Sequence, residues 1–292
     1  MNIKIVLNRY IYLMLSIITL SSLGSCQSDE VDNGLSASSV DASFSVTPVE
    51  GKVNVYKIAA QRKGVLTSLW NTGKGLTAGK MEFEISFPDA GTYTIYHKAI
   101  GAGGVAAEAT QQLVVAVSDP EKGNLVKGGS FENAADNANW TSCQLNKDGF
   151  ASWTFNNGSA TINSKGGWAQ EGIYQAIDVV KDKEYTIDML VSSMNGSDET
   201  WFEVYAGTTV PVAGSEYKDN KVMGLSTWDG CAKAPFEGFL SSIGCVKNQK
   251  TNTVSNVVKF DMTGKIYLVI RSGGNNFTPS GITVSKVEFR GK

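Results

Sequence analysis

The sequence predicts an all-β protein that contains two β-sandwich units in succession. Its length of 292 residues is sufficient for about two domains of ordinary size. Charged residues account for only 18 % of the chain and glycine for 31 positions, a composition typical of short strands joined by turns. Several segments alternate apolar and polar residues with the period of a strand, and none follows a helical period for more than about two turns.

The same composition excludes several classes of function. A net charge of −2 and a pI near 5.6, without a basic cluster, leave no surface that would attract a nucleic acid. His97 is the single histidine of the chain. The chain therefore has no metal site with two imidazole ligands, and any Ser-His-Asp triad would have to contain His97. Nucleophile-elbow, phosphate-loop and dinucleotide motifs are also absent from the sequence.

The first 26 residues have the pattern of an export signal. Lys4 and Arg9 provide positive charge, and residues 11–20 form an uncharged apolar run that is shorter than the roughly 20 residues needed to span a bilayer. The sequence Leu-Gly-Ser-Cys, ending at Cys26, follows and resembles the cleavage box of bacterial lipoproteins. The resemblance implies that residues 1–26 are a lipoprotein signal peptide with lipid attached to Cys26. An ordinary secretory peptide with a chance cysteine is the alternative.

Residues 27–40 are interpreted as a flexible tether, since most of them are serine, aspartate, asparagine or glycine. Its first four residues, Gln-Ser-Asp-Glu at 27–30, resemble the acidic tract that directs lipoproteins of Bacteroides-type bacteria to the outer cell surface. The resemblance implies a lipid anchor in the outer membrane and exposure at the cell surface. Retention on the periplasmic side is the alternative.

Residues 41–118 are expected to form the first and smaller sandwich. Along 81–87 four apolar residues share one face and the polar residues share the other, as in a strand with one face in water. Glycine and proline recur about every ten residues, as they do in β-sandwiches. His97 shares a strand face with Ile95 and Ala99, so we interpret it as a core or edge residue. The expected strands are 42–46, 52–56, 81–87, 92–100 and 113–117.

Two segments of this smaller unit carry family motifs. Residues 70–75 read Trp-Asn-Thr-Gly-Lys-Gly, and residues 90–95 read Ala-Gly-Thr-Tyr-Thr-Ile. They are similar to the Trp-Asp-Phe-Gly-Asp-Gly segment and the Gly-Thr-Tyr-Thr-Val strand of polycystic-kidney-disease (PKD) domains, with departures at Asn71, Thr72 and Lys74. The resemblance implies an Ig-like sandwich of the kind that serves as a spacer in surface proteins and secreted polysaccharidases.

A short polar linker at 119–123 separates this unit from a larger β unit at 124–292. Alternation places Ile187 and Met189 of one strand, and Ile266 of another, on the core face. About eight strands with long connections rich in glycine, asparagine and serine favour a jelly roll. The expected strands are 151–155, 159–162, 173–180, 185–192, 201–206, 254–260, 265–272 and 282–289.

The larger unit opens with a distinctive motif. Residues 124–132 read Asn-Leu-Val-Lys-Gly-Gly-Ser-Phe-Glu, and Trp140, Trp168 and Gln175 follow. The series resembles the Asn-Leu-x-x-Asn-Gly-Ser-Phe-Glu opening and the later tryptophans and glutamine of carbohydrate-binding modules of the family 4/9/22 type, except that Gly128 replaces an asparagine. The resemblance implies a galactose-binding-like jelly roll whose partner is a polysaccharide or oligosaccharide.

Many modules of that family hold a structural calcium ion between the opening glutamate and an aspartate on the last strand. Glu132 is present here, but the expected Asp-Asp-Val reads Ser-Lys-Val at 285–287. Calcium needs several oxygen ligands, and a lysine at that place opposes the ion. Glu132 therefore remains only a candidate calcium ligand, and we expect neither a firm metal site nor a cofactor.

The strand at 201–206 offers chemistry that binds a sugar. Phe202 and Val204 are expected in the core, which leaves Trp201, Glu203 and Tyr205 on the outer face at spacings of about 7 Å. Aromatic rings stack on the C–H face of a pyranose, and polar groups bind its hydroxyls. The remaining candidates for glycan binding are Trp168, Trp228, Arg271 and Asn275.

Packing is the competing interpretation of every aromatic residue, since large aromatic side chains most often fill cores. Trp140 and Trp153 are expected to be structural on this ground. Among the cysteines that follow Cys26, Cys231 and Cys245 are the best candidates for a disulfide in an oxidising compartment. Cys143 would then be a small buried apolar residue.

We therefore expect a non-catalytic cell-surface lipoprotein that captures a polysaccharide for surface uptake machinery or nearby enzymes. The alternatives are an adhesin or assembly protein with a protein partner, and a glycoside hydrolase with an unfamiliar carboxylate pair. A groove lined by Trp201 and Tyr205 would favour a glycan. A flat apolar patch of several hundred Å² would favour a protein, and two carboxylates about 5–9 Å apart in a cleft would favour hydrolysis.

Overall fold

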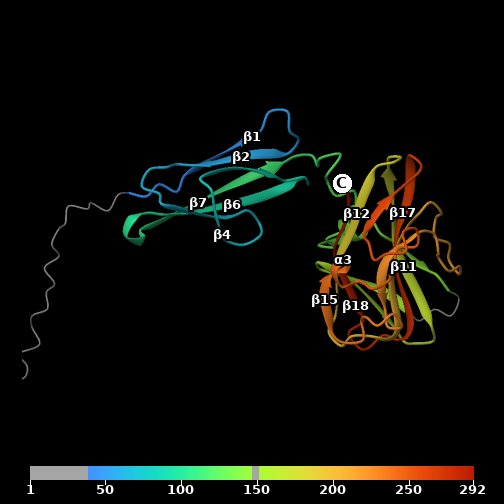
Figure 1. Cartoon of the computed structure of the whole chain (residues 1–292). Coiled ribbons are helices and arrows are strands. Elements are labelled where there is room, and N and C mark those ends of the chain that lie inside the picture. The colour runs from blue at the N-terminus through green and yellow to red at the C-terminus, as the bar shows by residue number, and fades with distance from the viewer. Residues whose placement is uncertain (1–38, 147–150) are drawn as a thin grey trace, which may run out of the picture.

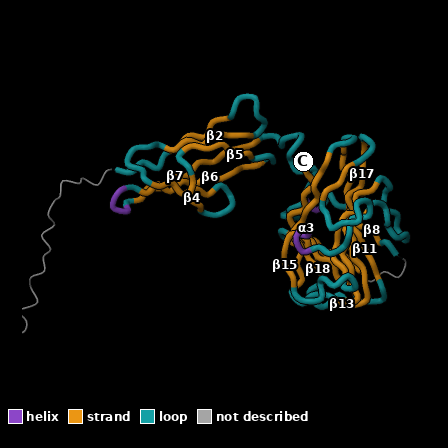
Figure 2. The backbone as a smooth tube through the Cα atoms, in the orientation of Figure 1, coloured by secondary structure: helices purple, strands orange, loops and turns teal. Residues whose placement is uncertain are grey.

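The computed structural model describes residues 39–146 and 151–292. Within these residues the chain forms four antiparallel sheets and three short helical segments (Figure 1, Figure 2). The all-β class predicted from the sequence is confirmed. The predicted signal peptide with Cys26, and the tether up to residue 38, lie outside the described residues. The described part of the chain contains no helix that is long and apolar enough to cross a membrane.

The strands between residues 44 and 115 form two sheets that share one core. The first sheet has the order β1 (Phe44–Pro48), β2 (Val55–Ala60) and β5 (Glu82–Ser86). The second has the order β4 (Thr77–Gly79), β3 (Thr67–Asn71), β6 (Gly91–Ile100) and β7 (Ala106–Val115), with the short turn η1 (Ala102–Gly104) between β6 and β7. Both sheets contribute to the core, which contains Phe44, Ile58, Trp70, Phe87, Ile95 and Val115.

His97 lies in this core, as the strand pattern predicted. It is fully buried, and its ring stacks on the Trp70 indole at a centroid distance of 3.9 Å. One ring nitrogen lies 2.7 Å from the Ala42 carbonyl oxygen and the other lies 3.0 Å from the Ser68 hydroxyl. Both polar atoms of the imidazole are therefore satisfied, and His97 has a structural role.

The strands of this unit differ from the expected ones at several points, and β1 lies at Phe44–Pro48 where 42–46 was expected. β2 begins at Val55 because residues 50–54 form a turn in which Asn54 has a left-handed φ of 51°. β7 begins at Ala106, well before the expected start at 113. The prediction missed its first part because polar residues interrupt the apolar pattern of this strand. β3 and β4 are additional to the expected strands, and the three residues of β4 are all exposed.

The strands between residues 141 and 291 form a second, larger sandwich. Its five-stranded sheet has the order β14 (Lys221–Ser226), β13 (Asp198–Gly207), β17 (Gly264–Asn276), β11 (Ala169–Val179) and β8 (Thr141–Gln144). The opposite sheet has the order β15 (Phe236–Phe239), β12 (Glu184–Ser193), β18 (Ile282–Gly291), β10 (Ser159–Ser164) and β9 (Ala151–Asn156), and β16 (Val257–Lys259) pairs with β12. The loops carry α2 (Ala134–Asn137) and α3 (Leu240–Ile243).

The core of the larger sandwich lies between its two sheets. Phe202 and Val204 of β13 are fully buried there, as are Ile187 and Met189 of β12 and Ile266 of β17, and these predictions are confirmed. The alternate residues of β13 consequently face outward. β8, β14 and β15 are additional to the eight expected strands, and the strand expected at 254–260 is confined to the three residues of β16.

The two sandwiches contact each other beside the linker at 119–123. Arg290, near the end of β18, donates two hydrogen bonds of 2.9 and 2.6 Å to the Asp89 carboxylate of the smaller unit. The same carboxylate accepts the backbone N–H of Asn124 at 2.7 Å. Asp89 therefore contacts both the start and the end of the larger sandwich.

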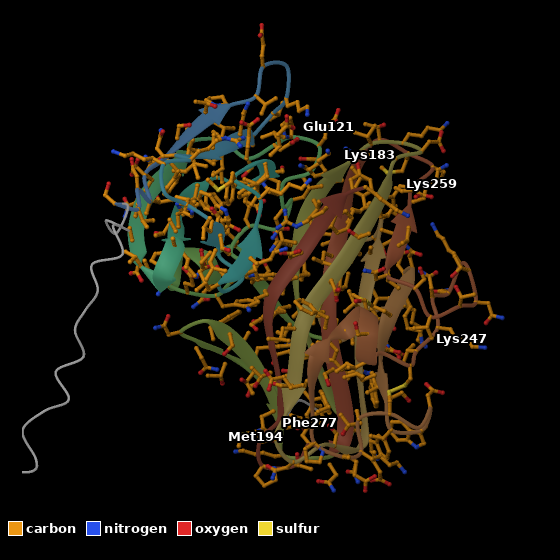
Figure 3. All side chains as sticks on the ribbon, turned by 60° about the vertical axis from the view of Figure 1, so that its left-hand side comes forward. Glu121, Lys183, Met194, Lys247, Lys259 and Phe277 are labelled. Carbon is orange, nitrogen blue, oxygen red and sulfur yellow. A yellow bond between two sulfur atoms is a disulfide. The ribbon has the colours of Figure 1, made fainter. Side chains whose placement is uncertain are left out.

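The larger sandwich has one end at this junction and one end away from it. Figure 3 labels Glu121 and Lys183 at the junction, where the Lys183 ammonium donates to the Glu121 carbonyl oxygen at 3.3 Å. Met194 and Phe277 mark the opposite end in the same view, which we call the far end. The candidate residues at the start of β13 lie toward this far end, because β17 pairs with β13 and ends one residue before Phe277.

Candidate functional site

One row of residues crosses the outer face of the five-stranded sheet near its far end. Trp201 of β13 pairs with Ser226 of β14 on one side and with Gly273 of β17 on the other. Gly273 in turn pairs with Gln170 of β11. The row therefore places a large indole next to a strand position that has no side chain.

Gly273 makes room for the Trp201 indole. A Cβ atom at position 273 would collide with the benzene ring of Trp201 and with the Cβ atom of Gln170. Glycine within a strand often marks such a close approach to the backbone. Trp201 is partly buried, and its Nε1 atom is enclosed without a hydrogen-bond partner among the described residues.

Two further tryptophans lie near Trp201 and are open to solvent. Trp168 is 48 % exposed and Trp228 is 57 % exposed. Their rings stack with centroids 6.1 Å apart, and the Trp228 ring lies 6.2 Å from the Trp201 ring. Because Trp168 precedes β11 and Trp228 follows β14, the two indoles meet across β13 and β17 from opposite sides. We call Trp168, Trp201 and Trp228 the aromatic cluster.

The loop before β11 holds Trp168 by its backbone. Trp168 has a left-handed φ of 59°, a conformation rare for a bulky residue and often found at functional sites. Its carbonyl oxygen accepts a hydrogen bond of 2.9 Å from the Asn146 side chain. The Gly167 N–H donates to the Asn275 side-chain oxygen at 3.3 Å, and the Asn275 amide donates to the Glu199 carboxylate at 2.7 Å. Asn275 thereby fixes this loop to the end of the sheet.

The turn after β14 holds Trp228. The predicted disulfide between Cys231 and Cys245 is present, three residues after Trp228. The Asp229 N–H donates to the Ser226 hydroxyl at 3.2 Å, and the Ser226 N–H donates to the Cys231 sulfur at 3.2 Å. The disulfide and these hydrogen bonds therefore hold the turn that carries the Trp228 side chain.

A polar pocket adjoins the Trp168 loop at the far end of the sandwich. It has a volume of about 270 Å³. Asn275, which holds the Trp168 loop, is one of its lining residues and is itself exposed. The polar lining residues are Asn163, Ser164, Lys165, Asn275, Asn276 and Thr278. The aromatic cluster and a set of hydroxyl and amide groups consequently lie side by side.

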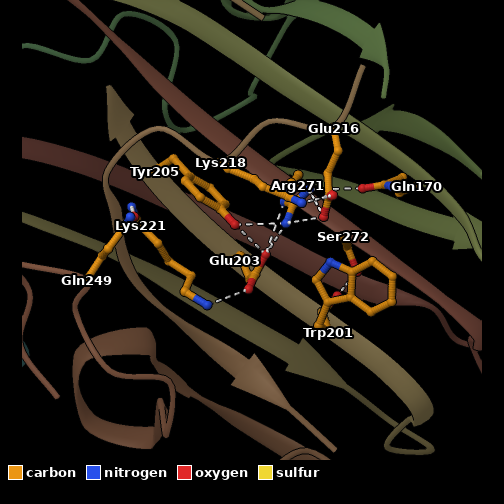
Figure 4. A network of polar contacts seen from close by, with 10 residues as sticks. All are labelled: Gln170, Trp201, Glu203, Tyr205, Glu216, Lys218, Lys221, Gln249, Arg271 and Ser272. Carbon is orange, nitrogen blue, oxygen red and sulfur yellow. Dashed lines mark hydrogen bonds and ion pairs between the residues drawn. The ribbon is translucent and has the colours of Figure 1, made fainter. Parts of the chain in front are cut away.

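The next row of the outer face is occupied by charged groups (Figure 4). Arg271 of β17 donates to one Glu203 carboxylate oxygen through Nη2 at 2.6 Å and Nε at 3.0 Å. The Tyr205 hydroxyl donates to the same oxygen at 2.7 Å, and the Lys221 ammonium donates to the other oxygen at 3.0 Å. Arg271 also contacts the Glu216 carboxylate at 3.4 Å. We call these five residues the ion cluster.

Glu203, Tyr205 and Arg271 form the buried part of the ion cluster, whereas Glu216 is exposed and Lys221 is partly buried. Burial alone would raise the pKa of Glu203, but attraction to Arg271 and the hydrogen bond from Tyr205 outweigh it, and the pKa lies below its ordinary value. The pKa of Glu216 also lies below its ordinary value. Burial opposes this shift, but the contacts with Lys218 and Arg271 outweigh it. Burial raises the pKa of Tyr205, so its hydroxyl remains a donor.

The loop at 208–220 covers the ion cluster from outside. Tyr217 of this loop is 5 % exposed and packs edge-on against Tyr205 at 5.5 Å. The Tyr217 hydroxyl donates to the Thr209 carbonyl oxygen at 2.9 Å. Asp219 accepts the backbone N–H groups of Thr208 and Thr209 at 2.7 and 2.9 Å, which fixes the base of the loop. The outer face is therefore closed beyond the Trp201 row.

The predicted outer-face platform is only partly open. Trp201, Glu203 and Tyr205 do share one face, but the expectation that Glu203, Tyr205 and Arg271 stand open to solvent is wrong. Their exposed fractions are 8 %, 3 % and 4 %, because they bond to one another beneath the 208–220 loop. Exposed candidate residues are Trp168, Trp228 and Asn275.

The other predicted residues have structural positions. Trp140 and Trp153 are buried and donate their indole N–H groups to the carbonyl oxygens of Gly128 and Glu171. Glu132 is exposed, and the described residues contain no group of three His, Cys, Asp or Glu side chains that would hold a metal ion. The free Cys143 is buried.

Sequence reasoning missed Gly273 and Gln170, which lie in the same row as Trp201. Arg271 donates to the Gln170 side-chain oxygen at 3.0 Å, so Gln170 connects the aromatic cluster to the ion cluster. The glycine pair at 273–274 inside a strand was a usable signal for a close backbone approach. Gln170 gave no comparable signal.

No protein-family model matches the chain, and no curated protein matches it. Among solved structures it is similar to carbohydrate-binding modules of the β-sandwich superfamily, at 14 % identity over 85 % of this chain and 97 % of that one, with a TM-score of 0.31. A structure described as CBM4 matches at 14 % identity over 57 % of this chain and 99 % of that one, with a TM-score of 0.30. The enzymatically active domain of tailspike protein 4 from bacteriophage CBA120 matches at 14 % identity over 61 % of this chain and 23 % of that one, with a TM-score of 0.34.

Proposed function

We propose that the larger sandwich binds a saccharide on the aromatic cluster at its far end. The observation that carries the proposal is the pair of exposed, stacked indoles of Trp168 and Trp228, held by separate loops above Trp201. Exposing two large aromatic side chains forgoes roughly 1.5–3 kcal/mol of burial energy for each, so a ligand is the physical reason to keep them at the surface.

Polar groups beside the rings supply what a sugar needs in addition. A pyranose has an apolar C–H face, which stacks on an indole, and a rim of hydroxyls, which need directed donors and acceptors. The Asn275 amide and the Glu199 carboxylate lie next to Trp168, and the polar pocket continues from Asn275. The arrangement therefore combines stacking surfaces with hydroxyl-binding groups.

Binding without catalysis is the mode that the carboxylates of the ion cluster support. A glycoside hydrolase needs a carboxylic acid with a raised pKa to protonate the leaving oxygen. Glu203 and Glu216 approach each other through Arg271, but both have lowered pKa values and both are engaged in ion pairs. They form a fixed support beside the aromatic cluster, and incubation with a bound polysaccharide should release no new reducing ends.

The wider role in this proposal is that of a surface lipoprotein. Cys26 carries the lipid, the 41–118 unit acts as a PKD-like spacer, and the module captures polysaccharide for uptake or for nearby enzymes. The motifs at 23–26 and 90–95 support this assignment. The aromatic cluster lies near the end of β17 that precedes Phe277, away from the spacer, and this position supports presentation of the site to the surroundings.

The test is retention of the purified protein in affinity gels that contain a panel of soluble polysaccharides. We expect Trp168→Ala and Trp228→Ala each to weaken retention by about tenfold or more, which corresponds to about 1.4 kcal/mol of stacking energy. Their melting temperatures should stay close to that of the wild type, because substitutions of exposed side chains change stability little.

Phe239→Ala is the matched control, since Phe239 is also an exposed aromatic residue, at 47 %, but belongs to β15 in the opposite sheet. It should leave retention unchanged. Wild-type protein that migrates freely through every polysaccharide would refute the proposed function, and equal effects of Phe239→Ala and Trp228→Ala would refute the site.

A further inference from the structure

Another cavity lies at the opposite end of β14 from Trp228. It has a volume of about 270 Å³ and is bounded by Asn220, which directly precedes β14, by the loop that contains Asn248, and by β16. We call it the edge pocket. Figure 3 labels its lining residue Lys259 toward the junction end of the larger sandwich. Because the six residues of β14 span about 20 Å, the edge pocket is separate from the aromatic cluster.

The Asn248 side chain brings an unused donor to the edge pocket. Asn248 is 3 % exposed, and its Oδ1 atom accepts the backbone N–H groups of Lys250 and Thr251 at 2.9 and 3.3 Å. These bonds fix the orientation of the amide, and its Nδ2 group has no hydrogen-bond partner among the described residues. Leaving a buried donor unpaired costs free energy, so a carbonyl oxygen that accepts from Nδ2 would bind favourably.

Asn220 brings the complementary acceptor. Its Nδ2 group donates to the Ala206 carbonyl oxygen at 2.6 Å, which identifies the other terminal atom of the amide as the oxygen. This Oδ1 atom is enclosed and also lacks a hydrogen-bond partner within the described part of the chain. The residues that line the edge pocket therefore include one unused donor and one unused acceptor.

The free edge of β16 adds backbone groups of the same kind. β16 pairs with β12 along one edge, and just before β16 the Asn256 carbonyl oxygen accepts the Ile187 N–H of β12 at 3.0 Å. Backbone groups alternate in direction along an antiparallel pair, so those of Val257 and Lys259 point away from β12. Both residues line the edge pocket. An amide in the ligand can pair with such an edge as another strand would.

The charges around the edge pocket favour a neutral ligand. Glu184 already faces Lys292 at 3.4 Å, and Lys259 faces Asp182 at 3.8 Å. Lys250, the third charged lining residue, is exposed to solvent. A carboxylate in the pocket would lie against the unused amide oxygen, and an ammonium group would lie against the unused amide donor.

We propose that the edge pocket binds a small neutral ligand through a secondary amide. The carbonyl oxygen of the ligand accepts from Asn248 Nδ2, and its N–H donates to Asn220 Oδ1. A methyl group beside the amide lies against Val257 and Val258, the apolar lining residues. An acetamido group has all three parts, and it occurs on N-acetylated amino sugars and on acetylated peptides. This site is additional to the proposed function and does not depend on the aromatic cluster.

The test is a nuclear magnetic resonance titration of the nitrogen-15-labelled chain without its signal peptide. The two amide probes are N-acetylglucosamine and N-acetylalanine methylamide, which carry the group on a sugar and on a peptide unit. Glucose is the control without an amide. We expect saturable shifts of the Asn248 side-chain NH₂ signals with at least one amide probe and none with glucose. The probe with the lower dissociation constant identifies the source of the amide.

Asn248→Asp is the variant that removes the donor and keeps the loop. It retains an oxygen for the N–H groups of Lys250 and Thr251 but lacks Nδ2. We expect the dissociation constant of the amide probe, followed by the backbone signals of β16, to rise about tenfold or more. Asn252→Asp is the matched control, because Asn252 is exposed in the same loop and does not line the edge pocket. It should leave the dissociation constant unchanged.

The outcomes separate the edge pocket from the aromatic cluster. Asn248 signals of the wild type that fail to shift with both amide probes would overturn the proposal, whether or not Asn248→Asp folds. Equal binding of glucose, or an unaltered dissociation constant in folded Asn248→Asp, would overturn it as well. Shifts confined to the indole N–H signals of the aromatic cluster would reject the edge pocket while supporting the proposed function.

Discussion

The Trp201 indole can lie over β17 because position 273 carries no side chain. Gly273→Ala would add a Cβ atom that collides with Trp201 and Gln170, so the indole must move away from the sheet. We expect this substitution to weaken saccharide binding by about tenfold, since Trp201 supports the ring of Trp228. Calorimetric titration with the bound saccharide and the tryptophan emission spectrum would measure the effect.

Gly172→Ala is the matched control for this substitution. Position 172 is in β11 of the same sheet, and its new Cβ atom would meet the flexible end of the Leu145 side chain at 3.2 Å. We expect near-normal binding and an unchanged emission spectrum. Unaltered binding in Gly273→Ala would contradict the role assigned to this glycine.

Glu203 holds the ion cluster together, so its replacement should affect stability more than binding. Glu203→Gln leaves Arg271 buried without its main counter-charge, and we expect a loss of roughly 3–5 kcal/mol in the free energy of unfolding. Glu84→Gln, which breaks the exposed ion pair with Lys52, should cost less than about 1 kcal/mol. Urea unfolding at neutral pH would measure both, and equal losses would contradict the structural importance of the ion cluster.

The stability gap between the wild type and Glu203→Gln should depend on pH. The pKa of Glu203 in the folded chain is below its ordinary value of 4.5, so the unfolded chain takes up this proton first. The stabilisation is therefore complete above the ordinary value and is lost as the pH falls through the lowered one. Urea unfolding between about pH 7 and pH 3 should show that this difference in the free energy of unfolding narrows as the pH falls. A constant difference would contradict the lowered pKa assigned to Glu203.

At the residue scale, the sequence predicted the direction of a side chain better than its exposure to solvent. Alternation along β13 correctly placed Trp201, Glu203 and Tyr205 on one face, because side-chain direction in a strand follows from local backbone geometry. Whether that face is open depends on the loop at 208–220. Its contacts, such as that of Tyr217 with Tyr205, are tertiary and leave no pattern within either segment.

At the element scale, the strands that were missed lack the signal on which the prediction depended. β14 is a nearly continuous run of buried residues, so it shows no alternation. β8 and β15 have only four residues each, too few for a periodic pattern. Trp228 lies in the turn that follows β14. The contact between the rings of Trp228 and Trp168 therefore could not be predicted from the sequence.

The disulfide between Cys231 and Cys245 should position Trp228 as well as stabilise the fold. The double substitution Cys231→Ser with Cys245→Ser frees the turn that follows β14, three residues from Trp228. We expect it to lower the free energy of unfolding by about 2–4 kcal/mol and to weaken saccharide binding at temperatures where the variant is folded. Calorimetric titration and the near-ultraviolet circular dichroism of the tryptophans would report the change.

Cys143→Ala provides the comparison, because Cys143 is the free cysteine among the described residues and lies in β8. We expect it to retain full affinity for the saccharide. Full affinity in the folded double variant would contradict a positioning role of the disulfide and would show that the hydrogen bond from the Asp229 N–H to the Ser226 hydroxyl suffices to hold the turn.

At the scale of the whole molecule, the junction and the aromatic cluster lie at opposite ends of the larger sandwich. β18 runs from the far end to Arg290 at the junction over ten residues, about 33 Å of strand. The polar composition of 119–123 favours a linker, but no sequence pattern predicted the Asp89–Arg290 contact. Those two residues are 201 positions apart, and each belongs to a segment with an independent local pattern.

The contact between Asp89 and Arg290 should limit the relative motion of the two sandwiches without affecting the site. Arg290→Met removes both hydrogen bonds to Asp89, and we expect a broader distance distribution in small-angle X-ray scattering. Lys265→Met, which breaks an exposed ion pair with Asp178 in the larger sandwich alone, should leave the scattering unchanged. Affinity for the saccharide should match the wild type in both variants, because the aromatic cluster is a strand length away from Arg290. Scattering of Arg290→Met that is identical to the wild type would mean that the linker alone sets the arrangement of the two units.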